Sequence, residues 1–344
     1  MNTPYHYIGL DIHKRTVSFC EKRVDGITVG SGTFSARRQG LEDWARSRTS
    51  PWLGGMEATL FTGFTYDVLK PYAIDLKVGH PLQLKAISYA KHKSDRIDAN
   101  TLADLLRVNL FPTSHMPTPL VRKLRQTLRY RNFLVRQAVR MKIKTTGLLM
   151  AAGVEYDATR VHRQGYFTEL LDNLGEVPPS VRELLQTTRA GLEMFQAAQK
   201  RILDALKKHD YLRERIARLM TIRGVGEMTA LTWALEIDDP TRFSNIKKVH
   251  SYCGLCSGRN ESAGKNKRAP LSKQRNPHIQ CMLIEAAKLA PRYNTQLKQV
   301  HTFAIDELGY NRNRATLTVA RKLAAYLFAI DKSGKDFIPK TDAL

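Results

Sequence analysis

Short apolar segments in the first hundred residues constrain the fold more than any other feature of this sequence. Residues 7–12 form an apolar run containing an acid, and residues 16–23 and 27–34 alternate around an Asp25-Gly26 turn signal. Two later apolar strands alternate with three helical patterns, the strands at 52–56 and 76–78 and the helices at 38–48, 61–72 and 94–108. Three antiparallel strands followed by alternating helices and strands predict an α/β domain with a mixed sheet.

The middle of the chain reads as two long helices. Prolines between 112 and 119 mark a boundary, after which residues 120–150 predict one long basic helix. Residues 181–219 predict a second helix, with apolar residues near heptad spacing. We interpret the pair as a coiled-coil-like dimer arm, with an ordinary amphipathic helix as the alternative.

The last third predicts a mostly helical domain. Residues 221–230 contain Gly224 and Gly226 between helical flanks and resemble a helix-hairpin-helix, although Arg223 replaces the usual proline. A glycine-rich basic loop at 253–275 follows. The expected domains are an α/β domain at 1–115, a helical linker and dimerisation region at 116–219, and a mostly α domain at 220–335.

Positive charge is concentrated, which indicates a polyanionic partner. The formal net charge is +23, from 55 basic and 32 acidic residues. Residues 105–154 contain no acid, and residues 240–284 contain only Glu261. Stretches that carry almost only positive charge repel themselves unless phosphates neutralise them, so we expect nucleic-acid binding. The expected contacts are Arg122, Lys123, Arg125, Arg129, Arg136, Arg140, Lys144, Gly224, Gly226, Arg259, Lys265, Lys267, Arg268 and Lys273.

Composition excludes several other classes. Hydrophobic residues make up 42% and charged residues 25%, which excludes a disordered chain, a collagen and a disulfide scaffold. No apolar run reaches the length of a membrane-spanning helix, and the first residues lack a signal-peptide core. Four cysteines favour a reducing compartment, so we expect a cytoplasmic protein.

Four carboxylates of the first domain form the candidate metal site. Asp11 and Glu57 end predicted strands, and Asp95 and Asp98 share one face of a helix. Gathered carboxylates repel unless cations hold them, and oxygen ligands suit Mg²⁺ or Mn²⁺. Two such ions can clamp the oxygens of a phosphoryl transfer. The alternative is four unrelated surface carboxylates.

Three segments together carry a resemblance to a known family. Residues 9–14 (Gly-Leu-Asp-Ile-His-Lys), 55–59 (Gly-Met-Glu-Ala-Thr) and 93–99 (Lys-Ser-Asp-Arg-Ile-Asp-Ala) resemble the IS110 family of insertion-sequence recombinases. The resemblance implies a RuvC-like domain with the ribonuclease H fold, and it places a catalytic D-E-D-D quartet on Asp11, Glu57, Asp95 and Asp98.

The basic loop resembles the transposase-domain signature of the same family. There a serine in an E-S-G-type loop is the nucleophile, which implies Ser262, and a later S-K-[RQ]-G-[ND] motif follows. Ala263 and Arg275 depart from the glycines of this pattern, and Ser257 and Ser272 lie close by. A serine hydroxyl needs activation by a base or metal. Lys265, Lys267 and Arg268 suit neutralisation of phosphate charge.

The resemblance implies an RNA-guided DNA recombinase of a bacterial mobile element, associated with the nucleoid. It implies a covalent phosphoserine intermediate and a non-coding bridge RNA that specifies donor and target DNA. It also implies dimers that pair into a tetramer, with the carboxylates of one protomer serving Ser262 of another.

Other functions remain open on the residues alone. A RuvC-like endonuclease or junction resolvase would use water as the nucleophile, and Gly9-Leu10-Asp11 also begins sugar-kinase and actin-like ATPases. A non-catalytic RNA-binding protein is a further alternative. The spacings of four residues also allow structural zinc, bound by Cys253, Cys256, His278 and Cys281.

Overall fold

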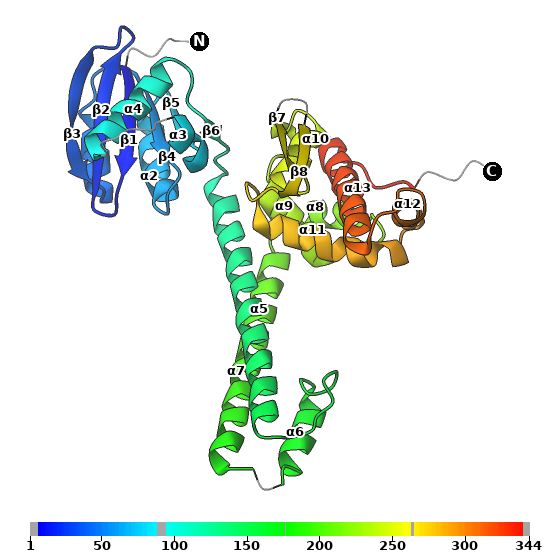
Figure 1. Ribbon diagram of the computed structural model, residues 1–344. Coiled ribbons are helices and arrows are strands. Elements are labelled where there is room, and N and C mark those ends of the chain that lie inside the picture. Colours follow the sequence, from blue (N-terminus) through cyan, green and yellow to red (C-terminus); the bar gives the residue numbers. More distant parts are fainter. Residues whose placement is uncertain (1–5, 88–93, 176, 263–264, 340–344) are drawn as a thin grey trace. The chain divides into compact units, whose positions relative to one another are not determined.

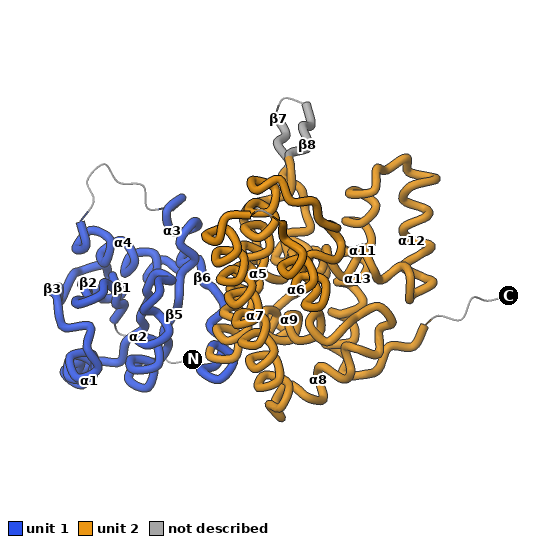
Figure 2. The backbone as a smooth tube through the Cα atoms, turned by 90° about the horizontal axis from the view of Figure 1, so that it is seen from below, with its two compact units in different colours: residues 1–122 blue, residues 123–344 orange. Residues whose placement is uncertain are grey.

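The computed structural model describes residues 6–87, 94–175, 177–262 and 265–339, and the side chains of 259–269 lie outside the described part. The chain forms two compact units, residues 1–122 and 123–344, coloured separately in Figure 2. The first is a mixed α/β sheet domain and the remainder is mostly helical (Figure 1). This confirms the prediction of an α/β sheet domain at the start of the chain, followed by a mostly helical remainder.

A six-stranded mixed sheet forms the centre of the first unit, with strand order β3-β2-β1-β4-β5-β6. The central strand β1 pairs antiparallel with β2 and parallel with β4. The strands are β1 (His6–Ile12), β2 (Thr16–Arg23), β3 (Thr28–Ser35), β4 (Trp52–Glu57), β5 (Asp75–Gly79) and β6 (Thr113–Ser114). The first five lie where the sequence predicts them, whereas the two residues of β6 are too short for a periodic signal.

Alternation along β1 and β4 divides the core between two faces of the sheet. Ile8, Leu10 and Met56 are fully buried and pack in one cluster with Trp44 and Trp52. Helix α4 covers the other face, because it contacts both β1 and β2. The helices of this unit are α1 (Arg38–Arg46), α2 (Thr62–Leu69), α3 (Pro81–Ile87) and α4 (Asp95–Arg107), with a 3₁₀ turn at Lys70–Tyr72.

Gly9 allows α4 to approach the sheet closely. A Cβ atom added at Gly9 would lie 2.0 Å from the carbonyl oxygen of Ala99 and 2.5 Å from the amide nitrogen of Ala103. Ala99 and Ala103 are themselves fully buried, so the helix presents small residues to the strand. This contact fixes the height of α4 over β1 and therefore the position of the helix N-terminus.

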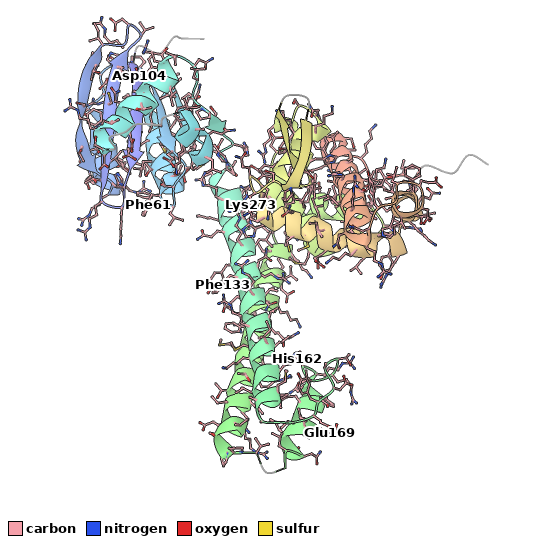
Figure 3. All side chains as sticks on the ribbon, viewed as in Figure 1. Phe61, Asp104, Phe133, His162, Glu169 and Lys273 are labelled. Carbon is pink, nitrogen blue, oxygen red and sulfur yellow. The ribbon has the colours of Figure 1, made fainter. Side chains whose placement is uncertain are left out.

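Two long helices follow, α5 (Pro119–Ala151) and α7 (Pro179–Lys207), with α6 (Gln164–Asp172) between them. The hydroxyl groups of Thr145 and Thr188 lie 3.2 Å apart where α5 meets α7. The prediction for α5 is confirmed to within one residue at each end. The exposed Phe133 lies on α5 (Figure 3).

The prediction of one continuous helix over 181–219 is wrong. It is interrupted at Lys208 and His209, and α8 (Asp210–Met220) follows. Buried leucines at 185, 192 and 206 fall on a seven-residue spacing that Gln199 interrupts, and the same spacing would next select position 213. The buried residue is Leu212 instead, whereas Arg213 is exposed. This shift in phase rotates the apolar stripe, so one straight helix cannot bury both parts.

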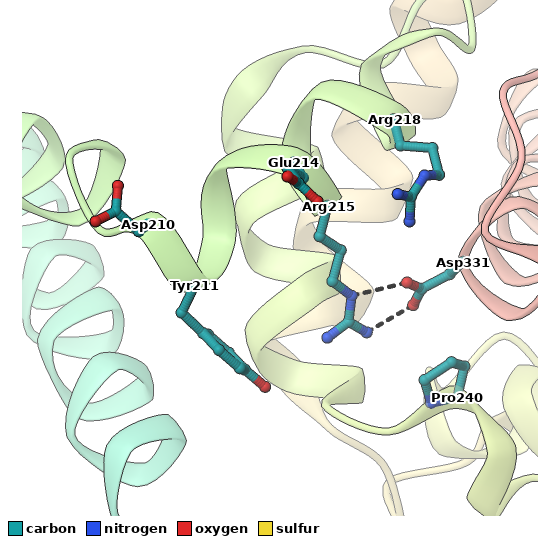
Figure 4. Close-up of a pocket in the computed structure, with 7 residues that line it drawn as sticks. All are labelled: Asp210, Tyr211, Glu214, Arg215, Arg218, Pro240 and Asp331. Atoms are coloured by element: carbon teal, nitrogen blue, oxygen red, sulfur yellow. Dashed lines mark hydrogen bonds and ion pairs between the residues drawn. The ribbon is translucent and has the colours of Figure 1, made fainter.

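The remaining helices pack around α9 and α13. They are α9 (Glu227–Ile237), α10 (Ile246–Tyr252), α11 (Pro277–Leu289), α12 (Thr295–Asp306) and α13 (Arg312–Ser333), with 3₁₀ turns at Pro240–Arg242 and Ala290–Arg292. Figure 4 shows a paired guanidinium and carboxylate that join α8 to α13, with Arg215 Nε 2.7 Å and Nη2 2.6 Å from the oxygens of Asp331. Trp233 also donates to Asp331, so this buried carboxylate is satisfied structurally.

The predicted basic loop at 253–275 contains an antiparallel hairpin instead of irregular chain alone. Strands β7 (Ser257–Ser262) and β8 (Lys265–Leu271) pair, with Glu261 opposite Asn266. The segment lacks apolar alternation, so no period-two signal predicts these strands. In the ranges described above, no helix is long and apolar enough to cross a membrane.

Candidate active site and nucleic-acid interface

Asp11 and Glu57 lie at the carboxyl ends of the adjacent central strands β1 and β4, and this end of the sheet is called the acidic edge below. The parallel register pairs Leu10 with Met56, so the next residue on each strand is one of the two acids. Leu10 and Met56 face the Trp44 core. Because successive side chains alternate, Asp11 and Glu57 point to the opposite face, which α4 covers.

Helix α4 brings two further acids to this edge. Ser94 caps the helix, since its side chain accepts a hydrogen bond from the amide of Ile97 at 3.3 Å. Asp95 and Asp98 therefore lie in the first turn, where the helix dipole favours negative charge. Burial raises the pKa of the Asp11 carboxyl above its ordinary value, and the charges of Asp95 and Asp98 raise it further.

His13 completes a tight cluster that sequence reasoning missed. Its Nε2 atom lies 3.0 Å from Asp11 Oδ2 and 3.2 Å from Asp95 Oδ2. Ligand atoms of His13, Asp11 and Asp95 all lie within 4.8 Å of one another. His13 follows Asp11 by two residues, and that spacing in extended chain is the signal that could have identified it.

The cluster fits a divalent cation. Its two carboxylate oxygens are the ligands that Mg²⁺ and Mn²⁺ prefer, and the Asp98 carboxylate lies close enough to help raise the pKa of Asp11. Of the predicted quartet, Asp11 and Asp95 belong to this cluster. Asp98 lies close enough to affect the pKa of Asp11, and Glu57 lies on the neighbouring strand end; both have interactions of their own.

Ser262 lies at the end of β7, where the backbone register pairs it with Lys265. The side chains of Arg259, Ser262, Lys265, Lys267 and Arg268 are outside the described part, so their predicted roles stay predictions. Two neighbouring serines are described. Ser257 pairs with Leu271 at the base of the hairpin, and the Ser272 hydroxyl accepts a hydrogen bond from the amide of Gln274 at 3.1 Å.

The basic residues that are predicted to contact nucleic acid and whose side chains the structure describes divide into two groups. Lys123, Arg136, Arg140, Lys144 and Lys273 are exposed and available to phosphates, and Figure 3 labels Lys273.

The other three basic residues contact the protein itself. Arg122 donates to the carbonyl of Pro117 at 2.5 Å and pairs with Asp67. Arg125 donates to the carbonyl of Leu235 at 2.9 Å, and Arg129 binds the buried Glu236. They recur at intervals of three and four residues, which places them on one helix face.

The glycine turn between α8 and α9 has a structural explanation. Gly224 has φ +93°, and a Cβ atom there would lie 2.8 Å from Cα of Ala290. Gly226 is the N-cap of α9, and a Cβ atom there would meet no atom within 4 Å. The turn therefore needs glycine at 224 for conformation and packing, while the space around Gly226 is open to a ligand.

The alternative zinc site is not formed among the described residues. Cys253 is buried and Cys281 is exposed, and these two do not join Cys256 and His278 in any group of close metal-ligand atoms. Burial raises the pKa of the Cys253 thiol strongly, as expected for a small core residue.

Two family models match this chain. Residues 8–153 match a model described as a transposase and labelled for the DEDD residues of IS110. Residues 216–302 match the model described as the transposase IS116/IS110/IS902 family. The sheet domain and the helical unit therefore both carry matches of one class, that of transposases.

Curated relatives agree with that class. The transposase for insertion sequence element IS1111A of Coxiella burnetii is 24% identical, over 94% of this chain and 88% of its own length. The transposase for IS1328 of Yersinia enterocolitica is 22% identical, over 76% of this chain and 80% of its own length. A match to y4qE of Sinorhizobium fredii, 22% identical over 71% of this chain, spans 59% of that relative. This chain belongs to the IS110 family of transposases.

Proposed function

We propose that this transposase is an RNA-guided DNA recombinase that cleaves and rejoins strands through a covalent phosphoserine at Ser262. The acidic edge formed by Asp11, Glu57, Asp95 and Asp98 assists that chemistry. The observation that carries the proposal is the gathering of Asp11, His13 and Asp95 within 4.8 Å at the end of the central strand. Family matches over both the sheet domain and the hairpin region support it.

The acidic edge would hold Mg²⁺ or Mn²⁺. A bound divalent cation would supply positive charge that polarises the scissile phosphate. His13 orients the carboxylates of Asp11 and Asp95 through its hydrogen bond to the first and its close contact with the second. Asp98 and Glu57 would complete the ligand set from α4 and β4.

Ser262 would supply the nucleophile. Its hydroxyl oxygen forms a bond to phosphorus and loses its proton, while the bond from phosphorus to the 3′ oxygen breaks and that oxygen takes up a proton. One phosphodiester is exchanged for another, so rejoining needs no ATP. Lys265, Lys267 and Arg268 would neutralise charge on the phosphate during this exchange.

A non-coding guide RNA and DNA are the proposed partners. Base pairing would read sequence, so the protein needs contacts mainly to backbone and shape. The exposed Lys123, Arg136, Arg140 and Lys144 along α5 support that role. The proposed assembly is a homodimer that pairs into a tetramer in the nucleoid region of a bacterial cytoplasm.

The finer architecture belongs to the same proposal. We infer a RuvC-like ribonuclease H fold for the sheet domain, supported by the acid at the end of the central strand β1 between antiparallel β2 and parallel β4. We also infer three functional parts, at 1–115, 116–219 and 220–335, with the middle part a coiled-coil-like dimer arm and the turn near Gly224 a helix-hairpin-helix-like element.

Trapping the protein on DNA tests this function. Wild-type protein with its guide RNA and Mg²⁺ should form a covalent protein–DNA adduct that survives denaturation, whereas Ser262→Ala should form none. Ser257→Ala and Ser272→Ala are the matched controls and should retain the adduct. If Ser262→Ala still cleaves DNA to free ends without an adduct, water is the nucleophile, and the protein is a RuvC-like endonuclease or junction resolvase.

A further inference from the structure

Glu236 is the one charged residue among the buried residues of α9. It lies in α9, where nine residues are buried, and its exposed fraction is 0%. Charged side chains are almost never fully buried unless they are paired, so this carboxylate requires partners. Its partners come from α5 and from the segment that carries the hairpin.

Two arginines of α5 contact the end of α9. Arg129 binds Glu236 with both ends of its guanidinium, with Nε 2.9 Å from Oε1 and Nη2 2.7 Å from Oε2. Arg125 donates to the carbonyl of Leu235 at 2.9 Å. A planar guanidinium that binds both carboxylate oxygens fixes direction as well as distance. Glu236 is therefore held in one orientation.

The same glutamate holds both ends of the hairpin segment. Asn276 Nδ2 donates to Glu236 Oε2 at 2.7 Å, and Tyr252 Oη donates to the Glu236 carbonyl at 2.8 Å. Tyr252 and Asn276 also contact each other, because the backbone amide of Asn276 donates a hydrogen bond to the backbone carbonyl of Tyr252 at 3.0 Å. Residues 253–275, which include β7 and β8, therefore begin and end at one residue: the Asn276 end meets the Glu236 carboxylate, and the Tyr252 end meets its backbone carbonyl.

We propose that Glu236, oriented by Arg129, is a positioning residue that holds the hairpin carrying Ser262 in its reactive placement through Asn276 and Tyr252. This inference rests on the proposed function. The end of β7 lies away from Tyr252 and Asn276 along the hairpin, so a small rotation at these two residues is amplified there. A misplacement of about 1 Å at a reacting group can reduce a rate by about 100-fold.

Hydrogen exchange and adduct kinetics on the full-length protein test the role. Glu236→Gln should accelerate exchange of the amides between 253 and 275 by about tenfold or more, with amides of α13 unchanged. With guide RNA, Mg²⁺ and saturating DNA, the limiting rate of adduct formation should fall by roughly 100-fold. The DNA concentration that gives half this rate should stay as in wild type, which separates placement from binding.

Two further variants keep the test decisive. Asn276→Ser retains a good cap for α11 but removes the amide donor to Glu236, so it should reproduce both effects without leaving Arg129 unpaired. Glu285→Gln is the matched control, because Glu285 is an exposed acid on α11 that pairs with Lys288, and it should change neither readout.

The inference is overturned if hairpin exchange is unchanged in both Glu236→Gln and Asn276→Ser, or if exchange rises equally throughout 123–344. A wild-type protein that forms no adduct overturns the proposed function instead. The exchange pattern then still decides whether Glu236 holds the hairpin.

Discussion

Asp11 meets two conflicting demands at the scale of a single residue. The proposed function requires its carboxylate to be ionised, yet burial and the charges of Asp95 and Asp98 raise its pKa above the ordinary value. A raised pKa in the folded state means that ionisation of this group costs stability, so the cost is absent at low pH and is incurred as pH rises through the folded pKa.

Asp11→Asn should therefore stabilise the protein while it abolishes cleavage. At pH 7 in EDTA the variant should unfold at a higher temperature than wild type, because its neutral amide leaves no charge to bury. The difference should shrink as the pH is lowered toward about 4, the ordinary pKa of an aspartate. Thermal unfolding at the two pH values measures this, and an equal or lower melting temperature at pH 7 would contradict it.

Sequence reasoning at this scale works for residues that follow a regular pattern. Asp11 and Asp95 meet as their positions at a strand end and a helix start predict. Glu236 was missed because an acid among apolar residues of a helix indicates that a partner exists but does not identify it. Arg129 is more than one hundred positions away, and only the packing of α5 on α9 brings it there.

At the scale of elements, the contact between α4 and β1 determines where the acids gather. Gly9→Ala should force α4 away from the sheet, because the new Cβ would lie 2.0 Å from backbone that cannot rotate aside. We expect a loss of about 1–3 kcal/mol in unfolding free energy, together with loss of DNA cleavage.

A glycine in open space provides the control for Gly9→Ala. A Cβ atom at Gly147 on α5 would meet nothing within 4 Å, so Gly147→Ala should leave cleavage unchanged and stabilise the helix by roughly 0.5–1 kcal/mol. Denaturant unfolding of both variants measures the difference. Normal stability in Gly9→Ala would show that α4 is not held by this contact.

Elements with a strong period were predicted well, and elements set by tertiary packing were not. Helix α5 was found to within one residue at each end because its apolar and basic residues recur over many turns. The break at Lys208 and His209 coincides with a shift of one residue in the spacing of the buried apolar side chains. A search for approximate heptad spacing does not detect so small a shift. The hairpin of β7 and β8 was missed because its sequence lacks apolar alternation.

At the scale of the whole molecule, the net charge of +23 should dominate nucleic-acid affinity. Each phosphate neutralised releases counterions, so affinity should fall steeply with salt. Arg136→Gln and Lys144→Gln should each weaken DNA binding regardless of sequence and lower the salt slope by about 1. Arg213→Gln is the control, because Arg213 is an exposed arginine on α8 that pairs with Asp210. Titrations at several salt concentrations measure the slopes, and equal slopes for all three variants would contradict the assignment.

The meeting of Tyr252 and Asn276 has an evolutionary consequence. A segment that leaves and returns at one point can gain or lose residues at its far end without displacing α10 or α11. Insertions and deletions between these two anchors are therefore nearly neutral for folding. Natural selection on the length of this segment acts through the reaction it supports and not through the thermodynamic stability of its neighbours.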